Sequence, residues 1–182
     1  FENAIEQHLM TSAGYEKGSP DAFDQEHGLF PQDVISFIQE TQPKEWEYLS
    51  TIQKDKAEAT LLDDLCRALN SEHEGCLSIL RHGFKCFGKT FRMAYFAPAS
   101  GMNPDTLKLY QANRLTITRQ LRYSSKHGNA LDVTLSLNGI PVATAELKNQ
   151  MTGQTWRNAV TQYKTDRDPA DLIFQFKKRA LV

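Results

Sequence analysis

Residues 130–149 read ALDVTLSLNGIPVATAELKN, two runs of small and β-branched residues separated by an Asn-Gly pair at 138–139. Val, Ile and Thr are typical of strands, and Asn-Gly is a preferred centre of a tight two-strand turn, so the stretch predicts a β-hairpin. Three charged residues interrupt the pattern, Asp132 in the first strand and Glu146 and Lys148 at the end of the second. Charges are depleted in strands and costly on a dry face, so we expect these side chains to be functional or wet.

The register of the hairpin decides whether these charges meet. Side chains alternate along a strand, so Asp132 and Glu146 meet only if they share a face of the sheet. A two-residue turn would pair 132 with 145 and place the two acids on opposite faces. A three-residue connection over 138–140, or an equivalent bulge, pairs 137 with 141 and 132 with 146. We predict this second register, which leaves an apolar face to pack against a helix, formed by Val133, Leu135, Leu137, Ala143, Ala145 and Leu147.

Two carboxylates on neighbouring strands require a compensating charge. At ~4 Å they would repel by roughly 4 kcal/mol at an effective dielectric constant of 20. Mg²⁺ prefers oxygen ligands, retains waters and is commonly held by one or two carboxylates together with substrate phosphate. We therefore expect Asp132 and Glu146 to be Mg²⁺ ligands that support hydrolysis of a phosphoryl group. Lys148, on the same face, would orient the attacking water or stabilise the charge of the transition state.

The acid-x-Lys triplet alone is weak evidence, because average composition yields about one in a chain of this length. The charge distribution gives it context. Residues 1–76 hold 5 Lys/Arg against 16 Asp/Glu, a net charge of −11, whereas residues 77–182 hold 16 against 6, a net charge of +10. A basic half that carries the hairpin favours a phosphate-rich partner, although the two halves would also neutralise each other within one fold.

The remaining patterns predict a mixed α/β (α+β) domain. Residues 1–76 form a mainly helical acidic part, with helices at 1–12, from Pro31 onward and at 61–69, and a loop at 18–32. Residues 77–182 form a basic, sheet-containing part. It includes the runs FRMAYFA and RLTITRQLRY and the hairpin, followed by a helix at 155–166 and a buried strand, LIFQF, at 172–176. The order implies a β-α-β crossover at the C-terminal side.

Length and composition restrict the class of protein. With 182 residues, 40% hydrophobic and 24% charged, the chain matches one soluble globular domain. No apolar run approaches the ~18 residues of a membrane span, and the first residues lack the order of a signal peptide, so we expect a cytoplasmic protein. Three cysteines without ligand spacing predict neither a disulfide framework nor a zinc site. A start on Phe1 and an end in RALV, which resembles a strand cut short, suggest a fragment of a longer chain.

The hairpin also carries a family resemblance. Asp132, thirteen residues and then Glu146-Leu147-Lys148 resemble the Asp and Glu-x-Lys signature of the restriction-endonuclease-like nuclease superfamily. The longer run AELKNQMTGQTWRNAVTQYKTDRDP, residues 145–169, is similar to the N-terminal nuclease region of type I restriction enzyme R subunits. The likeness is dense over 131–169, thinner over 1–15, and elsewhere rests on the order of elements.

The resemblance implies a central mixed sheet flanked by helices and Mg²⁺-dependent cleavage of double-stranded DNA. It also implies an ATP-dependent complex with modification and specificity subunits, in the cytoplasm of a prokaryote. The sequence holds no Gly-x-x-x-x-Gly-Lys-Ser/Thr loop, so the ATP-driven motor of such a subunit is expected beyond Val182.

By the same resemblance, Asp132 and Glu146 are metal ligands and catalytic residues, and Lys148 is the catalytic lysine. Related nucleases have a Gln-x-x-x-Tyr motif on the next helix, whereas Gln162 and Tyr163 are adjacent here; both are candidates for site support. On the apolar stripe of that helix, Tyr163 is expected to pack, and Gln162 to reach the site or a phosphate. A second group of candidates comprises Glu2, an acid of the first helix that relatives place near the metal, and three cations that would contact DNA phosphates from the polar side of the helix, namely Arg157, Lys164 and Arg167.

One alternative function stays open at this point. A nuclease fold can be retained as a non-catalytic module that binds DNA or docks partner subunits. The presence of all three of Asp132, Glu146 and Lys148 favours the enzyme.

Overall fold

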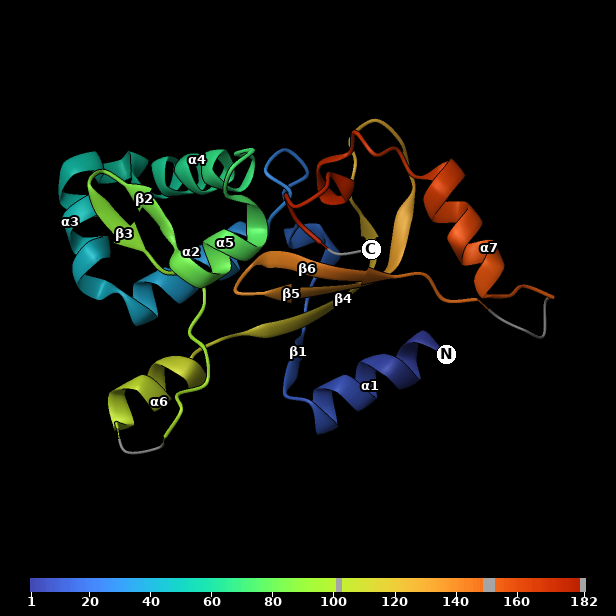
Figure 1. Ribbon diagram of the computed structural model, residues 1–182, viewed down its shortest axis with the longest axis horizontal. Coiled ribbons are helices and arrows are strands. Elements are labelled where there is room, and N and C mark those ends of the chain that lie inside the picture. Colours follow the sequence, from blue (N-terminus) through green and yellow to red (C-terminus); the bar gives the residue numbers. More distant parts are fainter. Residues whose placement is uncertain (101–102, 149–152, 181–182) are drawn as a thin grey trace.

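A mixed four-stranded sheet forms the centre of the molecule in a computed structural model, which describes residues 1–100, 103–148 and 153–180 (Figure 1). The sheet order is β1-β4-β5-β6, in which β1 is parallel to β4 and the other neighbours are antiparallel. The strands span Tyr15–Lys17, Leu115–Arg122, Ala130–Leu137 and Ile140–Ala145. This arrangement is the predicted α+β fold with a central mixed sheet and flanking helices.

Helices surround the sheet. They are α1 (Glu2–Ser12), α2 (Pro31–Thr41), α3 (Pro43–Gln53), α4 (Ala57–Leu69), α5 (Gly75–His82), α6 (Pro104–Gln111) and α7 (Trp156–Thr161), which continues as a π-helical turn, η4 (Gln162–Asp166). Short 3-10 turns are η1 (Pro20–Ala22), η2 (Lys54–Lys56) and η5 (Leu172–Phe174), and a separate hairpin comprises β2 (Phe84–Cys86) and β3 (Lys89–Phe91). Three of the helices begin with proline, whose missing N–H costs nothing in the first turn.

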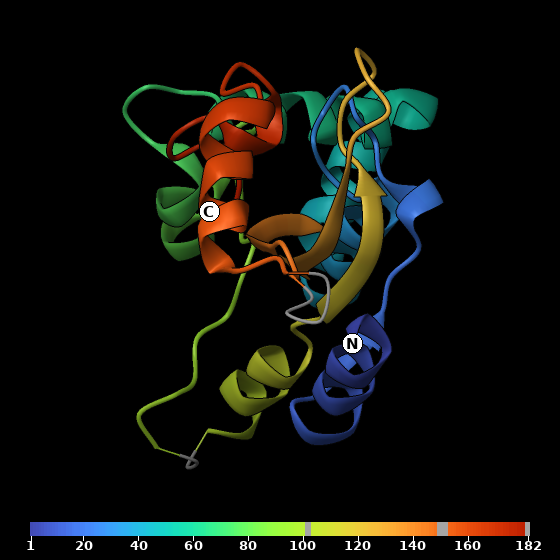
Figure 2. The same ribbon diagram turned by 90° about the vertical axis from the view of Figure 1, so that its right-hand side faces the viewer.

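The larger hydrophobic core lies beside the β5–β6 turn. Helices α2 to α5 and the β2–β3 hairpin enclose it, and its most buried side chains include Phe37, Leu61, Leu65, Ile79 and Phe91. Figure 1 shows these elements near the turn of β5 and β6, while α7 lies toward the opposite end of the two strands. Seen from the side in Figure 2, α7 and α1 stand apart, and the strand ends lie between them. The turn is therefore the buried end of the hairpin, and the end that carries Asp132 and Glu146 is the open one.

The β5–β6 turn contains two residues, Asn138 and Gly139, with φ angles of 50° and 84°. Two successive positive φ angles are the signature of a type I′ turn, which Asn-Gly favours. The Asn138 side chain is buried, donates to the Met93 carbonyl (2.9 Å) and accepts from the Arg114 N–H (2.7 Å). The Gly139 carbonyl accepts from the N–H of Phe30 (2.9 Å), just before α2. The turn is thus docked on the larger core.

A bulge in the hairpin sets the register that places the acids opposite each other. The pairs next to the turn are Leu137 with Ile140 and Ser136 with Pro141, whereas beyond an irregularity at 135–136 the pairs include Leu135 with Ala143 and Val133 with Ala145. Continuing this register by one residue puts Asp132 opposite Glu146. The predicted three-residue connection and the predicted pair of 137 with 141 are wrong, since the turn has two residues and Leu137 pairs with Ile140. Beyond the bulge, the register is the predicted one. Pro141 explains the bulge, because proline has no N–H for a regular ladder.

The two faces of the hairpin are less simple than predicted. Near the turn the polar face is buried, because Thr134 and Ser136 are 0% exposed and their hydroxyls have no protein partner among the described residues. On the face expected to be apolar and covered, Val133 is buried but Ala145 is exposed. On the polar face of β5, the side chain that reaches solvent is therefore the one at the end of the hairpin, Asp132.

Several predicted elements are corrected. The buried strand predicted at 172–176 is wrong. Residues 172–174 form a 3-10 turn, in which Phe174 donates its N–H to the carbonyl of Asp171 (2.9 Å) instead of to a neighbouring strand, and Phe176 is exposed. The expected β-α-β crossover is therefore absent from the described part of the chain. Helices α5 and α6 lie in the half predicted to be a sheet, and FRMAYFA contributes only Phe91 to a strand. The end of the predicted RALV strand, 181–182, lies outside the described residues.

A buried arginine connects the C-terminal segment to the loop before α2. Arg179 is 2% exposed and donates to the carbonyl of Gly28 (3.1 Å) and to Oδ1 of Asn70 (3.2 Å). It also donates to the carbonyl of His27. The guanidinium thereby connects three segments that are distant in sequence. It also donates hydrogen bonds to carbonyl groups of a loop that lies outside the named strands.

His27 in this loop predicts a pH dependence of stability. Its ring nitrogens lie 2.6 Å from Asp24 Oδ2 and 3.2 Å from Asp63 Oδ1. Burial disfavours the charged ring, but the hydrogen bonds to Asp24 and Asp63 outweigh burial and raise the pKa of His27 above 6.5. The protonated His27 ring therefore stabilises the folded state fully below pH 6.5, the pKa of an unfolded-state histidine. This stabilisation is lost as the pH rises through the higher pKa of His27 in the folded state.

We expect the free energy of unfolding to decrease as the pH rises above about 6.5, and we expect this decrease to be smaller in the His27→Asn variant. Urea unfolding at a series of pH values measures it. The control is His8→Asn, which alters an exposed histidine of α1. Parallel curves for the wild type and His27→Asn would show that the imidazolium does not stabilise this loop.

Candidate active site

Asp132 closes the open end of the hairpin. Its Oδ2 accepts the Leu147 N–H (2.7 Å), and its Oδ1 accepts from Nε2 of Gln120 on β4 (3.2 Å). The first bond holds the chain beyond β6 against β5, two residues after the ladder ends at Ala145. Asp132 is half-buried, so its carboxylate is ordered by the protein and still reaches solvent.

Glu146 lies in a buried ion pair with Arg167. Both side chains are 3% exposed, and the guanidinium donates to Oε1 of Glu146. Burial raises the pKa of Glu146 and Arg167 lowers it in part, while the negative charge of Asp132 raises it further. The charge of Asp132 therefore acts on Glu146, as expected for carboxylates that lie near each other in the predicted register.

Lys148 is held by the helix that follows the hairpin. Its ammonium donates to Oε1 of Gln162, in η4, and its positive charge acts on Glu146. The structure therefore brings Asp132, Glu146, Lys148 and Gln162 into one neighbourhood. Gln162 was predicted to reach the site, and its amide oxygen is the group that meets the lysine.

Tyr163 packs rather than pointing freely into the site. It lies against a smaller hydrophobic cluster that includes Leu121, Leu131 and Ile173. Its ring is 6.0 Å from that of Phe174, and its hydroxyl is 3.0 Å from Oγ1 of Thr144. Burial raises the pKa of the Tyr163 hydroxyl, with a smaller opposing effect of the Thr144 hydrogen bond. The expectation that this tyrosine packs is in accord with these contacts.

Glu2 on α1 is linked to the site through one amide. Its Oε1 accepts from Nε2 of Gln120 (3.0 Å), the same group that donates to Asp132. Its Oε2 accepts from Nε of Arg119 (3.2 Å). Glu2 therefore contacts Asp132 only through Gln120, and its negative charge is paired with Arg119.

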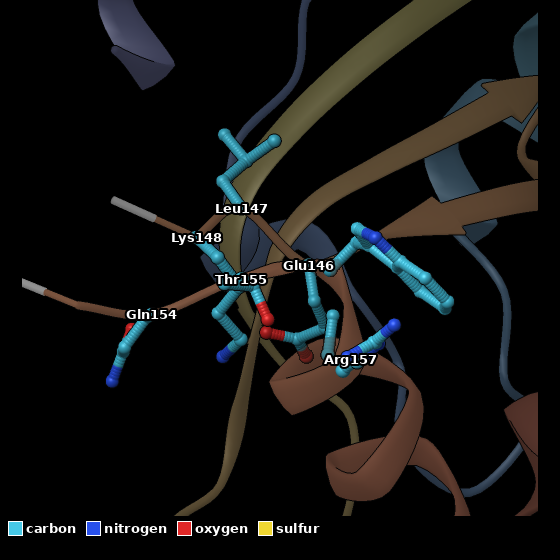
Figure 3. A pocket seen from close by; sticks show the side chains of 8 residues that line it. Glu146, Leu147, Lys148, Gln154, Thr155 and Arg157 are labelled. Carbon is cyan, nitrogen blue, oxygen red and sulfur yellow. The ribbon is translucent and has the colours of Figure 1, made fainter. Parts of the chain in front are cut away.

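The N-terminal end of α7 and the end of the hairpin enclose an open pocket of about 530 Å³ (Figure 3). Its lining includes Glu146, Lys148, Thr155 and Arg157. In Figure 3, Leu147 points away from Glu146, so the two polar side chains that flank it in sequence share the pocket. The pocket is open to solvent, so a ligand larger than the pocket could extend beyond it.

The three predicted phosphate-contacting cations differ in placement. Arg157 and Lys164 are exposed on the helix, and the Arg157 guanidinium lies 5.4 Å from the Trp156 ring. Arg167 is 5% exposed, so its predicted position on the polar side of the helix is wrong. The π-helical turn causes the error, because the Arg167 N–H bonds to the carbonyl of Gln162, five residues back, and the wider turn directs the side chain inward.

The sequence did not indicate two residues that contact the site, Gln120 and Tyr123. Gln120 has a φ of 51°, which interrupts the regular alternation of β4 and carries no recognisable sequence signal. Tyr123 is buried just beyond β4, and its hydroxyl accepts a hydrogen bond from Nη1 of Arg167 (3.0 Å). Its partner is 44 residues away, so only the fold could reveal the pair.

The two carboxylates suit a hard divalent cation that keeps several water ligands. Among the described residues, no group of three or more His, Cys, Asp or Glu side chains is gathered as a metal centre. Mg²⁺ does not need one, since it is often bound by one or two carboxylates with waters and phosphate oxygens. Arg167 engages Oε1 of Glu146, so the second oxygen is not used by this ion pair. Asp132 and Glu146 therefore fit Mg²⁺.

Comparison with known proteins identifies the family of this chain. In the described part of the chain, no helix is long and apolar enough to cross a membrane. No curated protein and no solved structure is similar enough to count as a match. The model of the family described as type I restriction enzyme R protein N terminus matches residues 2–179 of the 182. Because the match covers nearly all of the chain, this protein belongs to the family of type I restriction enzyme R protein N-terminal domains.

Proposed function

We propose that this domain is a Mg²⁺-dependent endonuclease that hydrolyses phosphodiester bonds of double-stranded DNA within an ATP-dependent type I restriction complex. The observation that carries the proposal is the bulged register, which puts Asp132 and Glu146 in one electrostatic site beside Lys148. Membership of the family fits this role. The proposal treats residues 1–182 as one nuclease domain of a longer, cytoplasmic subunit that works with modification and specificity subunits.

Asp132 and Glu146 would hold the cation. When bound, Mg²⁺ supplies positive charge for the phosphoryl oxygens and lowers the pKa of a water. Asp132 is already fixed by the Leu147 N–H and by Gln120, so little ordering is needed when the site is used. Glu146 brings the second carboxylate from the neighbouring strand position.

Lys148 would act on the reacting phosphate. Its ammonium is held by Gln162 at the rim of the pocket, where it would exchange this neutral partner for a phosphoryl oxygen or the attacking water. A positive donor aimed at the developing charge stabilises the transition state more than the ground state. Gln162 would keep the lysine oriented until DNA arrives.

Arg157 and Lys164 would contact the DNA backbone. Both are exposed on the helix after the hairpin. Contacts of this kind position the duplex and weaken as salt is raised, and they carry no base information. Sequence specificity would therefore come from another subunit, as the proposed complex requires.

The test is DNA cleavage by the reconstituted complex with ATP and Mg²⁺, using the Lys148→Ala variant of the intact protein. We expect cleavage to fall by about 10²–10³-fold, because one transition-state donor is removed. ATPase activity, measured in parallel, should not change, since the proposed motor lies outside this domain.

Lys85→Ala is the matched control, because it removes an exposed lysine from β2 in the other part of the molecule. It should cleave as the wild type does. If the complex cleaves normally without Lys148 and without Asp132, the nuclease assignment is wrong, and the domain is a DNA-binding or subunit-docking module.

A further inference from the structure

The ion pair of Glu146 and Arg167 is the most deeply buried charge pair near the site. Each side chain is 3% exposed. A buried ion pair is weak as a source of stability, since desolvation offsets much of the attraction between the charges. Its presence next to an active carboxylate therefore calls for a functional explanation.

Arg167 is anchored by groups other than Glu146. Its Nη1 donates to the Tyr123 hydroxyl (3.0 Å), and its Nη2 donates to the Ala130 carbonyl (2.9 Å). The guanidinium also lies 5.4 Å from the Tyr123 ring, and the π-helical turn fixes the backbone before it. With these contacts and 5% exposure, the guanidinium is held in place whether or not Glu146 meets it.

We propose that Arg167 is a positioning residue that holds Oε1 of Glu146 so that the other carboxylate oxygen is presented to the divalent cation. The inference rests on the proposed function. Arg167 balances the negative charge of the buried Glu146 beside Asp132 and restricts its rotation. Hydrogen-bonding partners behind a metal-binding carboxylate commonly have this role, and their loss weakens metal affinity by about 10–100-fold.

The opposite role would be a latch, in which Arg167 competes with the cation for Glu146. A latch must withdraw when the metal binds. Arg167 has no exposed side toward which to move, and withdrawal would break its bonds to Tyr123 and Ala130. The two roles differ in sign, because removal of a positioning residue weakens cation binding and removal of a latch strengthens it.

The experiment is a titration of the intact, nucleotide-free protein with Mn²⁺ alone, in which free Mn²⁺ is measured by electron paramagnetic resonance. Glu146→Gln identifies the site, because it should bind one fewer class of Mn²⁺ than the wild type. We expect Arg167→Met to raise the Kd of that site by about 10–100-fold. Arg167→Lys, which keeps the charge but not the planar fork, should recover part of the affinity.

Tyr123→Phe is a second test that leaves the ion pair intact and removes one anchor. The loss of one hydrogen bond predicts a Kd about 5-fold higher. Tyr110→Phe, which alters an exposed tyrosine of α6, is its control and should bind as the wild type does. If Arg167→Met does not fold, as judged by circular dichroism, the Tyr123→Phe result decides.

The outcomes separate this inference from the proposed function. If the wild type and Glu146→Gln bind Mn²⁺ alike, the carboxylates do not hold a cation, and the proposed function fails with the inference. If Glu146→Gln loses the site but Arg167→Met and Tyr123→Phe bind with unchanged or higher affinity, only the positioning role is overturned.

Discussion

Replacement of Asp132 by asparagine is expected to reduce DNA cleavage by the reconstituted complex by about 10³-fold, with ATPase activity retained. The substitution removes one negative charge from the site at almost constant shape. The asparagine oxygen still accepts the Leu147 N–H that Oδ2 of Asp132 accepts at 2.7 Å. The end of the hairpin should therefore stay in place, and the loss reports on the charge of Asp132.

Asp132→Ala gives the comparison, because it removes both the charge and the acceptor for Leu147. If charge is what matters, the two variants should be equally inactive. If Asp132→Asn cleaves normally and only Asp132→Ala is inactive, Asp132 acts by holding the chain at Leu147 and is no metal ligand. Asp168→Ala, which alters an exposed acid beyond the helix, is the matched control.

The hairpin and its pairing were predictable because local rules agree there. Asn-Gly favours a type I′ turn, alternation favours strands, and the need to bring two acids to one face selects the shifted register. The backbone feature that produces the shifted register was less predictable. The turn takes two residues, and a bulge beside Pro141 provides the shift, since proline cannot join a regular ladder.

The misplaced elements depend on contacts between distant segments. Helical periodicity put Arg167 on the polar side of its helix, but a π-helical turn rotates it toward Tyr123, 44 residues away. The apolar run at 172–176 was read as a strand, and Ile173 is indeed buried, yet the segment turns back on itself. In the second case, hydrophobicity correctly predicted the burial of Ile173, but Phe176 is exposed and the backbone conformation is not a strand.

The turn itself should be sensitive to substitution of its glycine. A Cβ on Gly139 would lie 2.6 Å from the Phe30 carbonyl oxygen and 2.8 Å from the Val34 nitrogen. Both are backbone atoms, which cannot move aside as the end of a flexible side chain can. The φ of 84° adds strain for any other residue. We expect Gly139→Ala to lower the free energy of unfolding by about 3–4 kcal/mol, the sum of the φ penalty and overpacking.

The loss should appear as a fall of roughly 10 °C in Tm, measured by circular dichroism. Gly88→Ala separates the two causes, because Gly88 has a similar φ of 76° and no atom within 4 Å of the added Cβ. It should cost only about 1 kcal/mol. Equal losses in the two variants would mean that close docking of the turn on α2 does not contribute. A larger loss at Gly139 would show that close docking on α2 anchors the hairpin at its buried end, the end opposite to the one that carries Asp132.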